Sequence, residues 1–164
     1  MIIENTATIG ELLTSSGVIF TAVGLMLNIV RIRKESIRTR SEFMLNLRNQ
    51  FISNDGMNAI FYKIEHGKLR REDISSGSED ERNLDKLLYF YDGIARHYEA
   101  ENIKEKNLEC MAYEFIRVSK NLAVRDYIDF VKSLSSNCKI KDVPFSAFMR
   151  VGKLLEEQNK KNSE

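Results

Sequence analysis

Nineteen consecutive residues, from Leu12 to Val30, carry no charged side chain, and Glu11 and Arg31 bound this run. As an α-helix, which rises about 1.5 Å per residue, the run is roughly 28 Å long and matches the hydrocarbon core of a bilayer, about 30 Å thick. Small and polar residues dilute its hydrophobicity, so a buried helix of a globular domain is the alternative. The length predicts one transmembrane helix over residues 12–30, preceded by a short periplasmic N-terminus, residues 1–11.

The charges on the two sides of this run are asymmetric. The segment before it contains two glutamates and no basic side chain, whereas the ten residues after it carry five basic side chains: Arg31, Arg33, Lys34, Arg38 and Arg40. Such residues stay on the cytoplasmic side of a bacterial inner membrane and contact anionic lipid headgroups. A cleaved signal peptide is not favoured, because its basic residues would precede the apolar run. We expect a single-pass inner-membrane protein with a cytoplasmic C-terminal part and the lipid bilayer as a partner.

Small and polar residues recur along the run at alternating spacings of four and three: Gly10, Thr14, Gly17, Thr21, Gly24 and Asn28. On one helix these positions form a heptad seam, along which a second backbone can approach at the glycines. Thr21 and Asn28 would then hydrogen-bond across the interface. The seam predicts a homo-oligomer, and the alternative is a chance alignment of residues that are common in membrane helices.

Beyond residue 30 the sequence indicates only helices. It contains a single proline, Pro144, and almost no alternating β-branched residues, which strands usually show. The predicted fold class is all-α. We expect the transmembrane helix to continue into a basic juxtamembrane stalk, residues 31–53, followed by a small helical cytosolic bundle, residues 54–156, and a flexible tail, residues 157–164.

Two segments of the bundle have distinct helix signals. Met57, Ile60 and Ile64 follow a helical spacing that Gly67 closes, and a polar loop comes next. Ser78 and Glu81 then have the S-x-x-E spacing of a capping box.

The apolar residues after this box, from Leu84 to Tyr98, mark the strongest helix, which should form the centre of the core. Two more helices are expected from about Lys104 to Ser119 and from about Val124 to Leu134, and Pro144 should open the last one.

The span and the basic stretch are followed by apolar residues at recurring spacings: Phe43, Leu47, Phe51, Met57 and Ile60, and later Leu87, Phe90, Ile94 and Ala95. In this order the chain resembles a bacterial family of small membrane proteins classed only as a domain of unknown function. The resemblance covers most of the chain, implies a membrane-anchored helical domain, and carries no catalytic residues across. By analogy, some similarly built proteins with a cytosolic sensor act in bacterial antiviral defence.

Motifs that carry catalysis are missing from the sequence. It has no GxGxxG, GxxxxGK[ST], GxSxG or HExxH, and so lacks the minimum parts of a phosphate cradle, a nucleophile elbow or a zinc peptidase helix. His97 and Glu101 have the i, i+4 spacing of two metal ligands, but a third ligand is not evident. Cys110 and Cys138 lie far apart and are interpreted as inert thiols. We expect no catalytic residue, no metal and no cofactor.

A second basic cluster follows Gly67. Lys68, Arg70 and Arg71 are candidate contacts for an anionic ligand such as a nucleotide, RNA or an acidic protein tail, although acidic residues follow directly. The net charge of +1 does not indicate a strong nucleic-acid binder.

Three hypotheses for the function follow. The first is a membrane-tethered interaction or scaffold module that self-associates and binds an unidentified cytosolic protein or anionic signal. The second is an effector whose spans form a pore or disrupt the membrane when the cytosolic domain senses a signal. An enzyme is the third, and we expect the chain not to be one.

Overall fold

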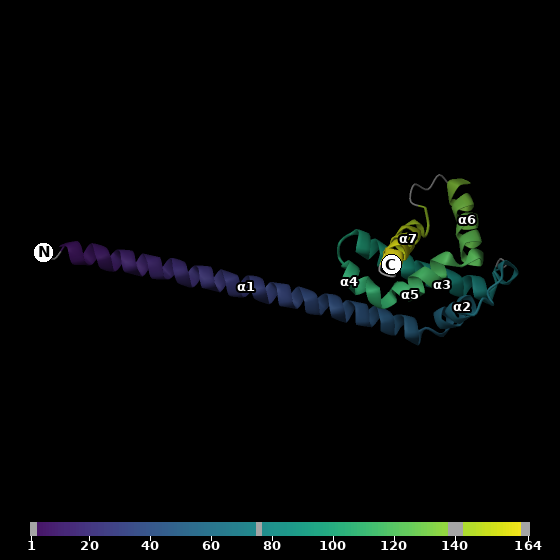
Figure 1. The fold of residues 1–164 in the computed structure, drawn as a ribbon, viewed down its shortest axis with the longest axis horizontal. Coiled ribbons are helices and arrows are strands. Elements are labelled where there is room, and N and C mark those ends of the chain that lie inside the picture. The colour runs from purple at the N-terminus through teal and green to yellow at the C-terminus, as the bar shows by residue number, and fades with distance from the viewer. Residues whose placement is uncertain (1–2, 75–76, 138–142, 162–164) are drawn as a thin grey trace. The chain divides into compact units, whose positions relative to one another are not determined.

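The computed structural model describes the backbone of residues 3–74, 77–137 and 143–161, and the side chains of residues 25–74, 77–136 and 143–161. Within these ranges the chain is entirely helical, and no strand occurs, which confirms the all-α class. The elements in chain order are α1 (Ile3–Ser53), α2 (Asp55–Glu65), η1 (Arg71–Asp73), α3 (Glu79–Glu99), α4 (Glu105–Leu108), η2 (Glu109–Met111), α5 (Ala112–Lys120), α6 (Leu122–Asn137) and α7 (Ser146–Lys161). Figure 1 labels the seven α-helices.

The chain divides into two compact units, Met1–Phe43 and Met44–Glu164. The first unit consists of the N-terminal part of α1. Its described side chains from Leu25 to Thr39 are all exposed. The second unit begins within the predicted stalk, because Met44 and Phe51 on the last turns of α1 are buried.

The expectation of a single-pass inner-membrane protein is corrected by the structure. Among the described residues, no helix is both long and apolar enough to cross a membrane. The physical reason in this part of α1 is that the uncharged run ends at Val30, and Arg31, Arg33 and Lys34 interrupt any longer run. The earlier part of the predicted span, residues 12–24, lies outside the residues whose side chains are described. The pore-forming alternative required such a membrane-crossing helix.

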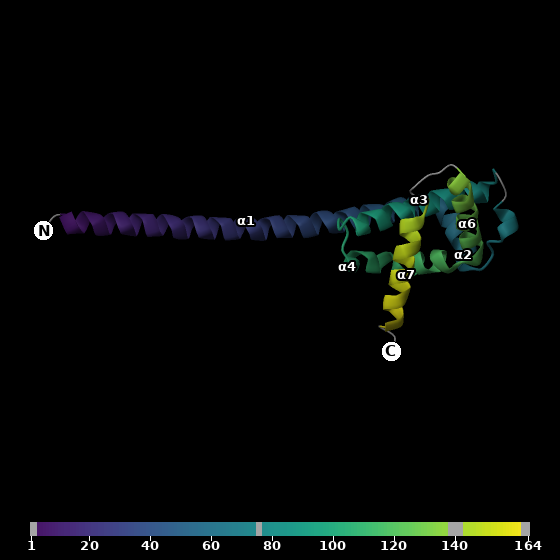
Figure 2. The ribbon, with the colours of Figure 1, turned by 90° about the horizontal axis from the view of Figure 1, so that it is seen from above.

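The core of the second unit is built around α3, as predicted. Leu84, Leu87, Leu88 and Tyr91 have no exposed surface, and α3 contacts α2 on one side and α7 on another. Figure 2 shows α7 running across α3 and α5, and both pairs are in contact. Burial of each such large side chain contributes roughly 1.5–3 kcal/mol, so α3 is the main apolar contact of the domain.

The N-terminus of α3 confirms the predicted capping signal with one change. The Ser78 hydroxyl accepts a hydrogen bond from the backbone N–H of Glu81 at 3.0 Å. The Glu81 carboxylate reaches back to the backbone N–H of Gly77 at 2.5 Å rather than to that of Ser78. Two of the N–H groups at the start of the helix region are thereby satisfied.

The helix expected from about Lys104 to Ser119 is instead broken into α4, η2 and α5. Leu108 and Met111 are both buried and lie three residues apart. Since a 3₁₀-helix has three residues per turn, the tighter η2 places both side chains on the inward face.

At the C-terminal end, α7 continues to Lys161, into the segment expected to be a flexible tail. An ion pair between Lys160 and Glu156 at 2.8 Å lies along its last turns.

Candidate functional site

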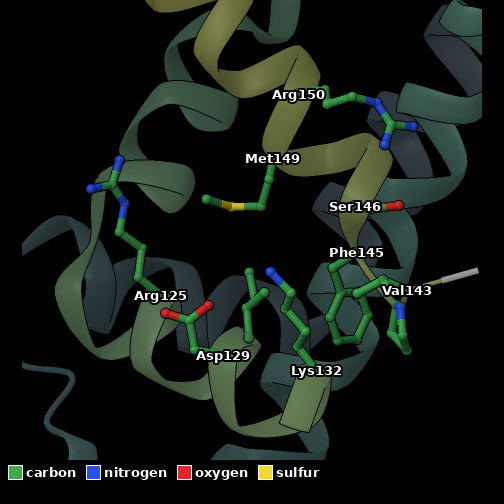
Figure 3. A pocket seen from close by; sticks show the side chains of 10 residues that line it. Arg125, Asp129, Lys132, Val143, Phe145, Ser146, Met149 and Arg150 are labelled. Atoms are coloured by element: carbon green, nitrogen blue, oxygen red, sulfur yellow. The ribbon is translucent and has the colours of Figure 1, made fainter. Parts of the chain in front are cut away.

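A groove between α6 and α7 is the candidate site. Its volume is about 440 Å³, within the range of small-molecule pockets. We call it the α6–α7 groove, and its lining residues are Arg125, Ile128, Asp129, Lys132, Val143, Pro144, Phe145, Ser146, Met149 and Arg150. Figure 3 shows Lys132 and Met149 extending into it from opposite helices.

One wall of the groove depends on an unusual backbone conformation. Phe145, just before α7, has a φ of +63°, in the left-handed region that is strained for a bulky residue. Its ring is 1% exposed and packs edge-on against the ring of Tyr89, with 5.0 Å between centroids. Burial of this ring therefore offsets the strain and fixes the turn that carries Val143 and Pro144.

The start of α7 is held by a carboxylate from α3. Asp92 is buried, and one of its oxygens accepts a hydrogen bond from the backbone N–H of Phe148 at 3.0 Å. Its other oxygen accepts from Arg96 Nε at 2.7 Å. A negative charge at a helix N-terminus is favourable, so Asp92 positions the α7 wall of the groove.

The cations around the groove differ in whether they already have an interaction partner. Arg150 extends away from the groove in Figure 3 and forms a bidentate ion pair with Glu99, at 2.7 and 2.8 Å. Arg125 donates from Nε to the backbone carbonyl of Ser119 at 2.9 Å. The Lys132 ammonium and the Asp129 carboxylate have no partner among the described residues. The groove thus offers two available cations against one carboxylate.

A second hollow of about 290 Å³ adjoins the groove and shares Arg125, Met149 and Arg150 with it. It adds Ser119, Lys153 and Glu156. Glu156 is paired with both Lys120 and Lys160, and these lysines lower its pKa.

A separate hollow of about 580 Å³ lies beside Gln50, Met57, Asp85 and Tyr89. Burial raises the pKa of Asp85, although the Tyr127 hydroxyl donates to it at 2.7 Å. Burial, and then this bond to Asp85, raise the pKa of Tyr127. The Asp85–Tyr127 hydrogen bond joins α3 to α6, which gives these two residues a structural role.

The predicted second basic cluster lies at the start of η1. Lys68, Arg70 and Arg71 are all exposed. The Arg71 guanidinium lies 5.5 Å from the centre of the Phe130 ring, a cation–π distance that ties η1 to α6. Binding of an anionic ligand by these three residues stays a prediction.

Only the end of the predicted seam lies among the described side chains. Asn28 is exposed, whereas Gly10, Thr14, Gly17, Thr21 and Gly24 lie outside the described side chains. In the basic stretch, Arg31 pairs with Glu35 at 3.2 Å and Arg38 with Glu42 at 2.7 Å. These pairs neutralise part of the charge that was expected to contact lipid, while Arg33 and Lys34 are exposed and Arg40 is half-buried.

Among the described residues, the pair considered for metal binding does not have the predicted helical spacing. Glu101 lies beyond the end of α3 with a φ of +60°, so it does not share a helical face with His97. Within the described residues, no group of three candidate ligands could hold a metal ion. Partial burial raises the pKa of the Cys110 thiol, which keeps the thiol protonated. Cys138 lies outside the described residues.

Sequence reasoning missed the α6–α7 groove. Arg125, Asp129 and Lys132 lie at i, i+4 and i+7, so their shared face on a helix was a readable signal. The groove contains a hydroxyl at Ser146 and a carboxylate at Asp129, but these groups are not hydrogen-bonded to each other as a nucleophile and its base would be.

No family model, curated protein or solved structure matches the chain. The resemblance to a bacterial family of small membrane proteins therefore gains no support from them.

Proposed function

We propose that this chain is a non-enzymatic helical interaction module that self-associates through α1 and presents the helical domain Met44–Glu164 to a protein partner. The proposal does not depend on a membrane.

The exposed apolar surface of α1 carries the proposal. Leu25, Met26, Leu27, Ile29 and Val30 lie within six residues, and each side chain is 49% to 72% exposed. Clusters of this kind on proteins mark interaction surfaces. Each of these side chains gains roughly 1.5–3 kcal/mol on full burial, so a partner that covers them is strongly favoured.

A second copy of α1 fits this surface better than a partner with a single sign of charge. Next to the apolar cluster, Arg31 and Arg38 alternate with Glu35 and Glu42 along one stripe, with a period of seven residues for each sign. A second copy presents both signs on the same stripe, whereas a uniformly acidic partner would leave the glutamates opposed by like charge.

Sedimentation velocity of the full chain tests the proposal. We expect a dimer or larger assembly for the wild type. The double variant Leu25→Glu, Ile29→Glu places two charges on one face of the apolar cluster and should raise the dissociation constant at least a hundredfold, since about 1.5 kcal/mol or more is lost per side chain.

The matched control is Ser36→Glu, Thr39→Glu, which adds the same charge to exposed polar positions of the same helix. It should change assembly far less. A monomeric wild type, or equal assembly of both double variants, would show that α1 does not join copies of this chain.

A further inference from the structure

We propose that the α6–α7 groove is a binding site for a small organic anion, a carboxylate or a phosphate monoester attached to an apolar group. Nothing in the proposed self-association through α1 requires this site.

The size and lining of the groove set the kind of ligand. Its volume is about 440 Å³, enough for a small molecule and too small for a folded partner. Ile128 and Phe145 line it and are 6% and 1% exposed, so their apolar atoms are held in place by the core. Together with Pro144 and Met149, they provide an apolar wall that a charged ligand without an apolar part would not use.

Two cations point to the charge of the ligand. The Lys132 ammonium extends into the groove in Figure 3 and has no ion pair among the described residues. Arg125 lies two turns earlier on α6, on the far side of Asp129 in Figure 3, and is held by its Nε bond to the Ser119 carbonyl at 2.9 Å. The unpaired lysine is suited to a carboxylate or a phosphate, which accepts charge-assisted hydrogen bonds from its ammonium, and the arginine adds a second positive charge on the same helix.

Asp129 limits the charge that the groove accepts. It lies one turn from both cations on α6, at i+4 from Arg125 and i−3 from Lys132. Because its carboxylate offsets one positive charge, the groove suits one anionic group and disfavours a polyanion such as RNA, which would also bring phosphates to Asp129. Glu99 already neutralises Arg150, so that arginine adds no net charge to the groove.

The test uses 8-anilinonaphthalene-1-sulfonate, a fluorescent organic anion with the required apolar part, and the full chain. We expect saturable binding that weakens as salt is raised, and weaker binding of the uncharged N-phenyl-1-naphthylamine, which has the same ring system. Lys132→Met, which keeps the length and removes the charge, should weaken binding of the anionic probe at least tenfold.

The matched control is Lys106→Met, at an exposed lysine on α4 outside the groove. It should leave binding unchanged, and circular dichroism should show that both variants keep the helical content of the wild type. Displacement of the probe by octanoate or by phenyl phosphate would support the proposal and identify the preferred anionic group.

The probe also reports exposed apolar surface such as that of α1, and the lysine variants separate the two sources. Equal affinity of the anionic probe for wild type and Lys132→Met would overturn the proposal, because binding would then lie elsewhere. Equal affinity for the charged and uncharged probes, or displacement by neither competitor, would overturn it as well.

Discussion

The crossing of α5 and α7 depends on the absence of a side chain at Gly152. A Cβ atom placed there would lie 2.7 Å from both Cβ and Oγ of Ser119, closer than such atoms approach in folded proteins. Ser119 is buried on α5 and its Oγ donates to the Ile116 carbonyl at 3.3 Å. Gly152→Ala therefore forces the two helices apart or distorts Ser119.

The expected magnitude is the balance of two effects. Replacing glycine by alanine in a helix interior favours folding by about 1 kcal/mol, and overpacking a well-packed contact costs about 1–3 kcal/mol. Gly152→Ala should therefore lower the free energy of unfolding by about 1 kcal/mol. Gly93, within α3, is the matched control, because no atom lies within 4 Å of a Cβ added there. Gly93→Ala should raise the free energy of unfolding by about 0.5–1 kcal/mol.

Urea unfolding followed by far-ultraviolet circular dichroism measures both changes. A further variant, Ser119→Gly, removes the Cβ that Gly152→Ala meets, so the alanine should be stabilising in that background. The reasoning would be refuted if Gly152→Ala and Gly93→Ala changed stability in the same direction, or if Ser119→Gly left the effect of Gly152→Ala unchanged.

Two further predictions concern polar groups in the domain. The Tyr113 hydroxyl and then Arg117 lower the pKa of Glu65 below its ordinary 4.5, so Glu65 contributes stability that is present above the unfolded-state pKa and is lost as the pH falls through the folded-state pKa. Urea unfolding at several pH values should show wild type more stable than Glu65→Gln at neutral pH, with a smaller difference in acid; a constant difference would contradict this. The buried Tyr91 hydroxyl has no hydrogen-bond partner among the described residues, so Tyr91→Phe should raise the free energy of unfolding by about 1 kcal/mol in the same assay, and a loss of stability would mean that the hydroxyl is satisfied.

Elements with a strong local signal were predictable from the sequence. The apolar period from Leu84 to Ala95 specified a central helix, and the Ser78 cap fixed its start. Both depend on neighbours within one or two turns, which a sequence displays directly. The break of the expected helix after Lys104 into three pieces was not predictable, because it depends on which side chains the surrounding core accepts.

The inner-membrane expectation failed for a related reason. It rested on the length of an uncharged run and on the charges beside it, and neither property involves a contact between parts of the fold. In the described part of α1, Arg31 and Arg38 are paired with glutamates one turn away. The charge asymmetry therefore has a local explanation within the helix.

Only the α6 wall of the groove was predictable from the sequence, because the second wall depends on a contact between residues far apart in the chain. Pro144 favours an extended residue before it and a helix after it, yet α7 begins at Ser146 and Phe145 adopts a positive φ. Such a conformation costs about 1–3 kcal/mol. Burial of the Phe145 ring is worth a similar amount, and the Asp92 carboxylate bonds the Phe148 N–H. Since Asp92 lies on α3, the packing of α7 against α3 determines the turn that forms the groove wall, and a sequence pattern within α7 does not contain that information.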